Sequence, residues 1–436
     1  MTTVAMGQRT RDLYLVVVKM VDVAARAGFV LTATYGLAIA QAGQFGLIAT
    51  LVGLFAFAFN FERQVDIQRR SAGEPHPVFD RHVTQALKFF AFNWAVMVPV
   101  FVLAVALWAQ VGWPILMLAV IVVVAEHLSN QAYQYALINQ RYYPMLLIVA
   151  AKNGLLAAVV LYRALFARDG FDIAFVMQLW AVGAVLCTIG LGLLFHRLRD
   201  AAPKPQPFDF DRDILGQHRA SMTHFMIGLI AILILQFDRL AVGGLMSLEQ
   251  TGSYFRHTLL VAFAYQAFNI ASFNRITPAI FAAAKVETVG QLTARVTREY
   301  LKTLIGVPLL LAAAWGLDRI TGGVWSDRFD LSLLLMGLLL LGFMLRAAAD
   351  FPALIMNGRH EERFVLRRQV IAFVVGGVLL IGLTWRFGVW GAAWASIATN
   401  GLYAALNWQV LGRLPAGPTA AAVTEPGPLA ETGAPL

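Results

Sequence analysis

The stretch AVMVPVFVLAVALWAQVGWPILMLAVIVVVA, residues 95–125, contains no charged side chain over its whole length. It holds two long apolar runs, separated by a short segment around Gln110 and Gly112. A helix of about 20 apolar residues crosses the roughly 30 Å hydrocarbon core of a bilayer. A helix also satisfies its own backbone hydrogen bonds, as lipid requires. The stretch therefore predicts two membrane-spanning helices joined by a tight turn.

The rest of the chain has the same character. Of its 436 residues, 59% are hydrophobic and 14% are charged, and the mean hydropathy is +0.67. A soluble domain has about 45–50% apolar and about 25% charged residues. This length accommodates about twelve crossings and leaves no room for a soluble catalytic domain. The single cysteine, Cys187, provides no disulfide framework and no cysteine metal site.

Apolar runs bounded by charge, glycine or proline predict an all-α polytopic protein with about twelve helices in two pseudo-symmetric lobes of six. The helices are expected near 12–38, 45–67, 83–109, 113–137, 143–166, 172–197, 217–246, 251–282, 294–317, 330–356, 363–385 and 389–411. The expected domains are an N-terminal lobe (1–200), a cytoplasmic linker (201–216), a C-terminal lobe (217–412) and a disordered cytoplasmic tail (413–436).

Lysine and arginine gather in alternate connections, and this pattern predicts that both termini face the cytoplasm. The basic residues on that side include Arg9, Arg11, Arg69, Arg70, Arg141, Arg197, Lys204, Arg359, Arg363 and Arg413. The formal net charge of +9 is therefore mainly a signal of topology. A nucleic-acid partner is not expected, because the basic residues are dispersed over loops rather than gathered on one domain.

Two short patterns occur once in each half of the chain. Gln41-Ala-Gly43-Gln-Phe45 matches Gln250-Thr-Gly252-Ser-Tyr254, and Asn139-Gln-Arg141 matches Asn357-Gly-Arg359. Because the matches recur in order at nearly the same offset, they indicate a duplicated six-helix unit. An even number of helices gives both copies the same orientation, with an expected cleft between them.

The segment DRLAVGGLMSLEQTGSY, residues 238–254, resembles the DR, short-loop and GxY pattern of polysaccharide-transporter (Wzx-type) flippases. Residues 388–395, GVWGAAWA, are similar to the GxxGAAxA segment of the same family, which belongs to the MOP exporter superfamily. The resemblance implies a two-lobed transporter of the bacterial inner membrane that flips undecaprenyl-pyrophosphate-linked oligosaccharide. Membrane lipids, a polysaccharide polymerase and a co-polymerase are the further partners it implies. It also implies a wet, cationic cleft that opens laterally for the lipid tail.

The first helix carries three ionisable residues, Lys19, Asp22 and Arg26, on one face. Each costs about 2.5–3.5 kcal/mol at the centre of a membrane helix, so each needs a reason. One reading is a structural ladder of ion pairs between helices. The other is that Asp22 holds two cations around a substrate-facing Arg26, whose guanidinium suits bidentate phosphate contact.

Further polar residues inside predicted helices are candidates for the cleft or for ion coupling. The remaining cavity candidates are Lys152, His224, Asp238, Arg239, Arg256 and Arg346. Lys152, Arg239 and Arg256 could instead snorkel to the interface, and His224 could be a packing histidine. The proton- or sodium-coupling candidates are Glu126 and Asp350, although Glu126 could be a satisfied structural carboxylate and Asp350 could simply neutralise Arg346. Most tryptophans, Trp180 among them, are expected in an interfacial belt.

The sequence contains no phosphate-binding GxxxxGK[ST] loop, no HExxH motif and no GxSxG elbow. We therefore expect neither enzymatic activity nor a cofactor. Two rival functions stay open at this level. A MATE-like exporter of small cationic drugs should present an excess of carboxylates in its cleft, whereas a non-transporting subunit of a polysaccharide synthase complex needs its membrane charges only for structure.

Overall fold

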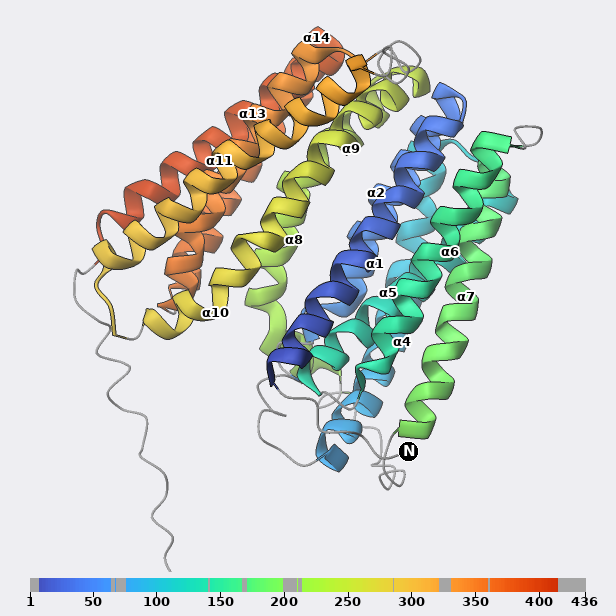
Figure 1. The fold of residues 1–436 in the computed structure, drawn as a ribbon, viewed down its shortest axis with the longest axis horizontal. Helices are drawn as coiled ribbons and strands as arrows, with labels where there is room; N and C mark the ends of the chain where they lie inside the picture. The colour runs from blue at the N-terminus through green and yellow to red at the C-terminus, as the bar shows by residue number, and fades with distance from the viewer. Residues whose placement is uncertain are drawn as a thin grey trace, which may run out of the picture. The chain divides into compact units, whose positions relative to one another are not determined.

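The computed structural model describes residues 8–63, 67, 76–139, 142–166, 171–198, 210, 214–284, 286–320, 331–359 and 361–414. Within these ranges the chain is helical, with short connections (Figure 1). The helices are α1 (Gln8–Gly36), α2 (Ile39–Asn60), α4 (His76–Ala109), α5 (Trp113–Ile138), α6 (Pro144–Phe166), α7 (Ile173–Leu198), α8 (Gly216–Leu245), α9 (Leu248–Ala271), α10 (Phe273–Ala283), α11 (Val289–Ile320), α13 (Leu333–Gly358) and α14 (Glu362–Leu411).

The predicted all-helical, polytopic fold is confirmed, with one local difference. The expected helix 251–282 is interrupted at Ser272, where α9 gives way to α10. The last two expected helices are both present under the label α14: the backbone leaves helical geometry at Gly388, and the segments on either side pack on each other, with Gly376 against Thr399. Gly388 has φ +59°, a conformation that glycine adopts without steric cost. The tail after residue 414 and most of the predicted linker lie outside the described residues.

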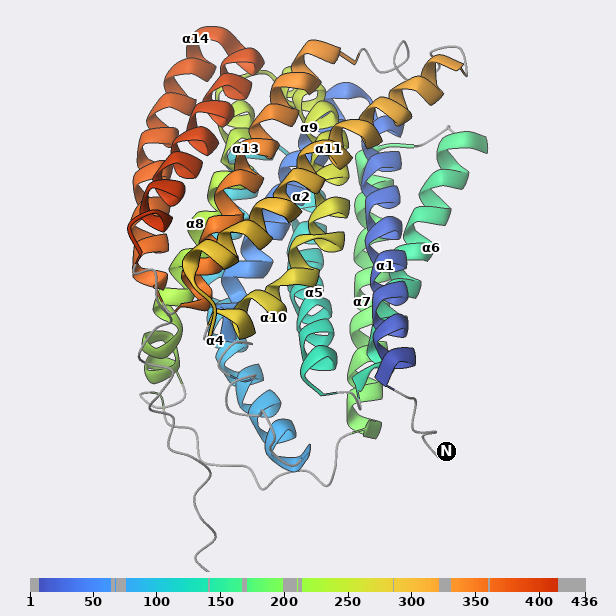
Figure 2. The ribbon, with the colours of Figure 1, turned by 60° about the vertical axis from the view of Figure 1, so that its left-hand side comes forward.

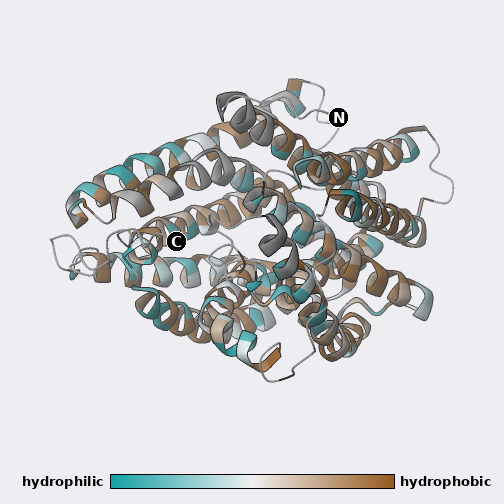
Figure 3. Cartoon of the chain, turned by 90° about the horizontal axis from the view of Figure 1, so that it is seen from below, coloured by the Kyte–Doolittle hydropathy of each residue, from teal (hydrophilic) through white to brown (hydrophobic). Residues whose placement is uncertain are grey.

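Across the described ranges, nine helices are long and apolar enough to cross a membrane. One of them is α14, which holds two of the predicted spans. The chain is therefore a multi-pass membrane protein. Figure 3 shows apolar residues along most of the helical ribbon. Large apolar side chains such as Leu103 and Leu107 on α4 and Leu186 on α7 are more than half exposed, as expected of surfaces that contact lipid.

The chain forms two compact units, residues 1–260 with 380–392 and residues 261–379 with 393–436. In the first unit α1 runs along α6, α5 packs on α7, and α2 contacts α4, α5 and α8 (Figures 1 and 2). Its core includes Phe29 and Trp180, whose ring centroids are 5.6 Å apart. In the second unit α13 packs against α10 and α11. The domain boundaries expected from the sequence stay a prediction, and α8 packs here with helices of the first lobe.

The two matched glycine motifs meet each other inside the first unit. Gly43 of α2 lies against the carbonyl oxygen of Leu248, and Gly252 of α9 lies against the carbonyl oxygen of Ile39. Each carbonyl belongs to the residue four positions before the opposite glycine. A Cβ atom on either glycine would overlap main-chain atoms of the other helix. Such close backbone approach is typical of small residues at membrane helix interfaces.

We predict that Gly252→Ala destabilises the protein. The added methyl group would overlap main-chain atoms that cannot move without separating α2 from α9, and overpacking of this kind costs about 1–3 kcal/mol. Thermal unfolding of the purified protein in detergent measures the effect. The matched control is Gly192→Ala on α7, where a Cβ would meet open space. Equal melting temperatures for the two variants would show that the glycine contact does not hold the helices together.

Candidate functional site

The candidate site includes the charged face of α1, which carries Lys19, Asp22 and Arg26. Asp22 is buried, and its Oδ2 lies 3.5 Å from Nζ of Lys19 on the preceding turn. Arg26 lies one turn further along, and its side chain is exposed. In the part of the chain that the structure describes, Arg26 forms no hydrogen bond or ion pair. The three residues therefore differ in their surroundings, although they share one face of the helix.

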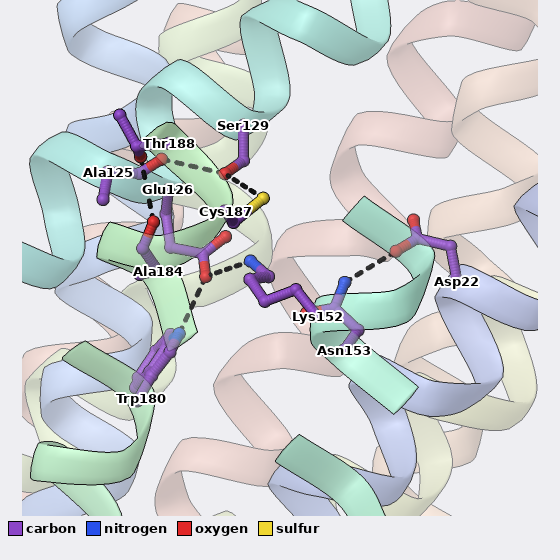
Figure 4. Close-up of polar contacts among 10 residues, drawn as sticks. All are labelled: Asp22, Ala125, Glu126, Ser129, Lys152, Asn153, Trp180, Ala184, Cys187 and Thr188. Carbon is purple, nitrogen blue, oxygen red and sulfur yellow. Dashed lines mark hydrogen bonds and ion pairs between the residues drawn. The ribbon is translucent and has the colours of Figure 1, made fainter. Parts of the chain in front are cut away.

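Helix α6 supplies the partners of this face. Asn153 is buried and its Nδ2 donates a hydrogen bond of 2.6 Å to Oδ1 of Asp22 (Figure 4). The preceding residue, Lys152, is also buried, and its Nζ lies 2.6 Å from Oε1 of Glu126 on α5. Adjacent residues of α6 thus bind two different helices, α1 and α5.

Glu126 is almost completely buried and accepts two hydrogen bonds. One comes from Lys152, and the other, of 2.8 Å, comes from Nε1 of Trp180 on α7 (Figure 4). One turn along α5, Ser129 contacts Cys187 of α7 at 3.6 Å. A buried carboxylate is tolerated when a cation and further donors satisfy it, and this is the environment of Glu126.

These residues form a cluster with an excess of positive charge. We name it the α1 cluster; its charged members are Lys19, Asp22, Arg26, Glu126 and Lys152. Three are basic and two are acidic, which leaves one positive charge when all are ionised. Lys19 is next to Asp22, and Lys152 is next to Glu126, so the excess charge resides on the exposed Arg26. An exposed guanidinium with this surplus can bind an anion.

The predicted residues of the α8–α9 hairpin have other partners. Asp238 is buried and accepts a 2.6 Å hydrogen bond from the hydroxyl of Tyr254, a residue of the second glycine motif. The guanidinium of Arg239 lies 5.7 Å from the centre of the Phe255 ring. His224 is half-buried on the same helix as Asp238. Among the residues described, the structure does not bring these side chains into hydrogen bonds or ion pairs with the α1 cluster.

Arg256 binds the end of α1. Its Nη2 donates to the carbonyl oxygens of Thr34 at 3.2 Å and Leu37 at 2.9 Å. The last carbonyls of a helix lack partners within the helix, and a basic side chain can satisfy them. Arg256 is therefore engaged with main chain, and its predicted role toward the substrate headgroup stays a prediction.

The second unit contains a separate ion pair between buried Arg346 and half-buried Asp350. Nε of Arg346 lies 3.0 and 2.9 Å from the two carboxylate oxygens of Asp350, one turn along α13. The hydroxyl of Tyr265 lies 3.5 Å from the same carboxylate, and the guanidinium lies 5.3 Å from the centre of the Tyr403 ring. The i, i+4 spacing read from the sequence thus places these charges in contact, while any role in ion coupling stays a prediction.

Two residues of the α1 cluster were missed by sequence reasoning. Trp180, expected in the interfacial belt, is buried and donates to Glu126. Asn153 was not singled out, because one asparagine in an apolar helix has many possible partners. Its position directly after Lys152 was the only signal in the sequence. The side chain of Lys152 does not extend to the membrane interface; it is buried in the first unit and paired with Glu126.

Comparison with known proteins relates this arrangement to a transporter fold. No family model and no curated protein matches the sequence. The lipid II flippase MurJ in an inward closed conformation matches with a TM-score of 0.66 and 11% identity, over 92% of this chain and 88% of MurJ. The chain has a MOP/MATE-like fold. An inward-facing multidrug MATE transporter of the MOP superfamily matches with a TM-score of 0.58 and 14% identity, over 90% and 94% of the two chains. A MATE protein in complex with MaL6 gives a TM-score of 0.55 at 13% identity, over 92% and 96%.

The solved structures that share the fold are transporters rather than enzymes. At these identities they establish the fold of the chain and not its substrate. The substrate is inferred below from the charges of the α1 cluster.

We predict that Lys152→Met strongly destabilises the MOP fold, because Glu126 would be left as an unpaired buried charge. Loss of one partner of a buried ion pair costs about 3–5 kcal/mol. The double variant Glu126→Gln/Lys152→Met should recover much of the loss. No charge of the pair then remains buried, and the side-chain amide introduced at position 126 can still accept from Trp180. Thermal unfolding in detergent measures both variants.

The control for this prediction is Lys302→Met. Lys302 pairs with Glu299 on α11, but its side chain is about half exposed, and an exposed pair contributes about 1 kcal/mol or less. The single variant Glu126→Gln completes the comparison. If the double variant loses as much stability as Glu126→Gln and Lys152→Met lose together, the two residues are not energetically coupled.

Proposed function

We propose that the protein is a flippase that moves an undecaprenyl-pyrophosphate-linked oligosaccharide from the cytoplasmic to the outer leaflet. The observation that carries the proposal is the exposed, unpaired Arg26 within a cluster of net positive charge on α1, among the residues that the structure describes. The MOP fold supports it, because a protein with this fold and a similar length is a flippase of lipid II. The motifs at 238–254 and 388–395, which resemble those of polysaccharide-transporter (Wzx-type) flippases, support a transporter of the same superfamily.

The substrate class follows from charge and size. A lipid-linked oligosaccharide has an anionic pyrophosphate, a large polar glycan and a long apolar tail. Arg26 offers bidentate hydrogen bonds to phosphate oxygens, and a guanidinium binds phosphate at lower desolvation cost than an ammonium does. The glycan needs a hydrophilic cavity, whereas the tail remains in lipid. We place the pyrophosphate at Arg26, with Lys19 adding positive potential from the preceding turn.

The charges of the α1 cluster favour this substrate over the small cationic drugs of a MATE-like exporter. Both carboxylates of the cluster are buried and bonded, to Asn153 and Lys19 in one case and to Lys152 and Trp180 in the other. A binding site for cations would need carboxylates that remain available. The group that is available is a cation.

Transport requires access to alternate between the two leaflets, which we attribute to rocking of the two lobes around a cationic central cavity. In this proposal the protein lies in the bacterial inner membrane with both termini in the cytoplasm. A proton or sodium gradient, or the membrane potential, supplies direction, with Glu126 and Asp350 as the coupling candidates. A polysaccharide polymerase and its co-polymerase would receive the flipped product.

We predict that Arg26→Ala lowers flipping of lipid-linked oligosaccharide by purified protein in reconstituted vesicles by about tenfold or more. One hydrogen bond to a charged group contributes about 1.5–3 kcal/mol. Arg26→Lys should retain part of the activity, because it keeps the charge but loses the bidentate geometry. The control is Arg163→Ala on α6, an arginine of the same unit that lies over the ring of Phe175.

Full transport by Arg26→Ala would exclude Arg26 as the phosphate-binding group. A wild-type chain that cannot flip the substrate in vesicles, although it is folded, would favour the non-transporting subunit of a synthase complex.

A further inference from the structure

Asn153 occupies an unusual place in the α1 cluster. It is 5% exposed and lies on α6, directly after a lysine that binds a different helix. Its amide nitrogen is the group that faces α1, since the carboxylate of Asp22 can only accept a hydrogen bond at this 2.6 Å distance. The bond connects residues 131 positions apart and fixes the direction of the Asp22 side chain.

Asp22 has an alternative partner that it does not use. Arg26 follows it at the i, i+4 spacing, and an acidic residue four positions before a basic one is the favourable order for a pair on a helix. Asp22 nevertheless directs Oδ1 to Asn153 and Oδ2 toward Lys19. No ion pair between Asp22 and Arg26 forms among the residues described. The carboxylate is thus held away from the guanidinium that could neutralise it.

We propose that Asn153 is a positioning residue that keeps Arg26 available for an anionic phosphate group by holding Asp22 away from it. The inference rests on the proposed function, since it assigns Asn153 a role at the pyrophosphate-binding arginine. A positioning role and a merely structural role predict different effects when Asn153 is lost. Loss of Asn153 acts through Asp22, because a buried carboxylate that has lost a donor gains by pairing with the nearest available cation. Lys19 is already paired with Oδ2, so the cation left for the freed Oδ1 is Arg26, at i+4 on the same face.

The test measures binding of inorganic pyrophosphate to the full-length protein in lipid nanodiscs by titration calorimetry. Asn153→Ala should weaken binding by about tenfold or more, the loss expected for one charge-assisted hydrogen bond. Asp22→Asn should bind at least as tightly as the wild type, because it removes the carboxylate that could pair with Arg26. The double variant Asn153→Ala/Asp22→Asn should bind much more tightly than Asn153→Ala alone. The gain from Asp22→Asn should also be larger in the Asn153→Ala background than in the wild type, a coupling that a structural asparagine would not give.

Asn93→Ala is the matched control. Asn93 is also buried in the first unit, but its Nδ2 donates to the carbonyl oxygen of Phe59, away from α1. It should leave pyrophosphate binding unchanged. Melting temperatures of all variants are recorded, and if Asn153→Ala does not fold, the comparison of Asp22→Asn with the wild type decides: weaker binding overturns the proposal.

The outcomes separate this inference from the proposed function. If Arg26→Ala loses binding while Asn153→Ala keeps it, or if Asp22→Asn fails to restore binding to Asn153→Ala, the positioning role is overturned and Arg26 keeps its role. If Arg26→Ala binds pyrophosphate as well as the wild type does, or the wild type does not bind it, the proposed phosphate site fails and the positioning role fails with it.

Discussion

The buried contact between Lys152 and Glu126 is the constraint on which the first unit depends. A charge inside a membrane protein is expensive unless it is paired, and this pair also receives the indole of Trp180. It fixes α6 against α5 and α7, and Asn153, the next residue of α6, fixes α1. In the positioning role proposed for Asn153, the availability of Arg26 to an anion depends on how α6 is held. In this account the buried charges of the α1 cluster are paired, and the charge that meets the substrate is left available.

A second constraint is the close approach of α2 and α9. Gly43 and Gly252 are equivalent positions of the two matched motifs, and each lies against main chain of the other helix. Near this contact Tyr254 bonds Asp238, and Arg256 binds the last carbonyls of α1. The end of α1 is thus tied to the α8–α9 hairpin, while its middle is tied to α6. The helix that carries the proposed phosphate site is therefore held at two positions: at its end by hydrogen bonds from Arg256 to main-chain carbonyls, and at its middle by the hydrogen bond between Asn153 and Asp22.

Most of the fold could be read from the sequence, because apolar runs of membrane length define helices almost independently of their neighbours. The break at Ser272 could not, since it depends on local packing. The charged face of α1 and the Arg346–Asp350 spacing were visible as helical periodicity. Their partners were not: Asn153 lies on α6 and Trp180 on α7, and the sequence does not say which helices pack together. Arg256 shows the same limit, because its acceptors are main-chain atoms of a distant helix.

The most direct test of the account is whether water reaches position 26. The only native cysteine, Cys187, is buried, so a Cys187→Ser chain carrying Arg26→Cys has one reporter thiol. In membrane vesicles made permeable to solutes on both sides, a charged, membrane-impermeant maleimide should label this thiol, whereas Leu186→Cys, on an exposed apolar surface of α7, should remain unlabelled in the same background. If Arg26→Cys reacts only with an apolar, lipid-soluble maleimide, position 26 faces lipid or dry protein, and the account of a hydrated anion site is contradicted.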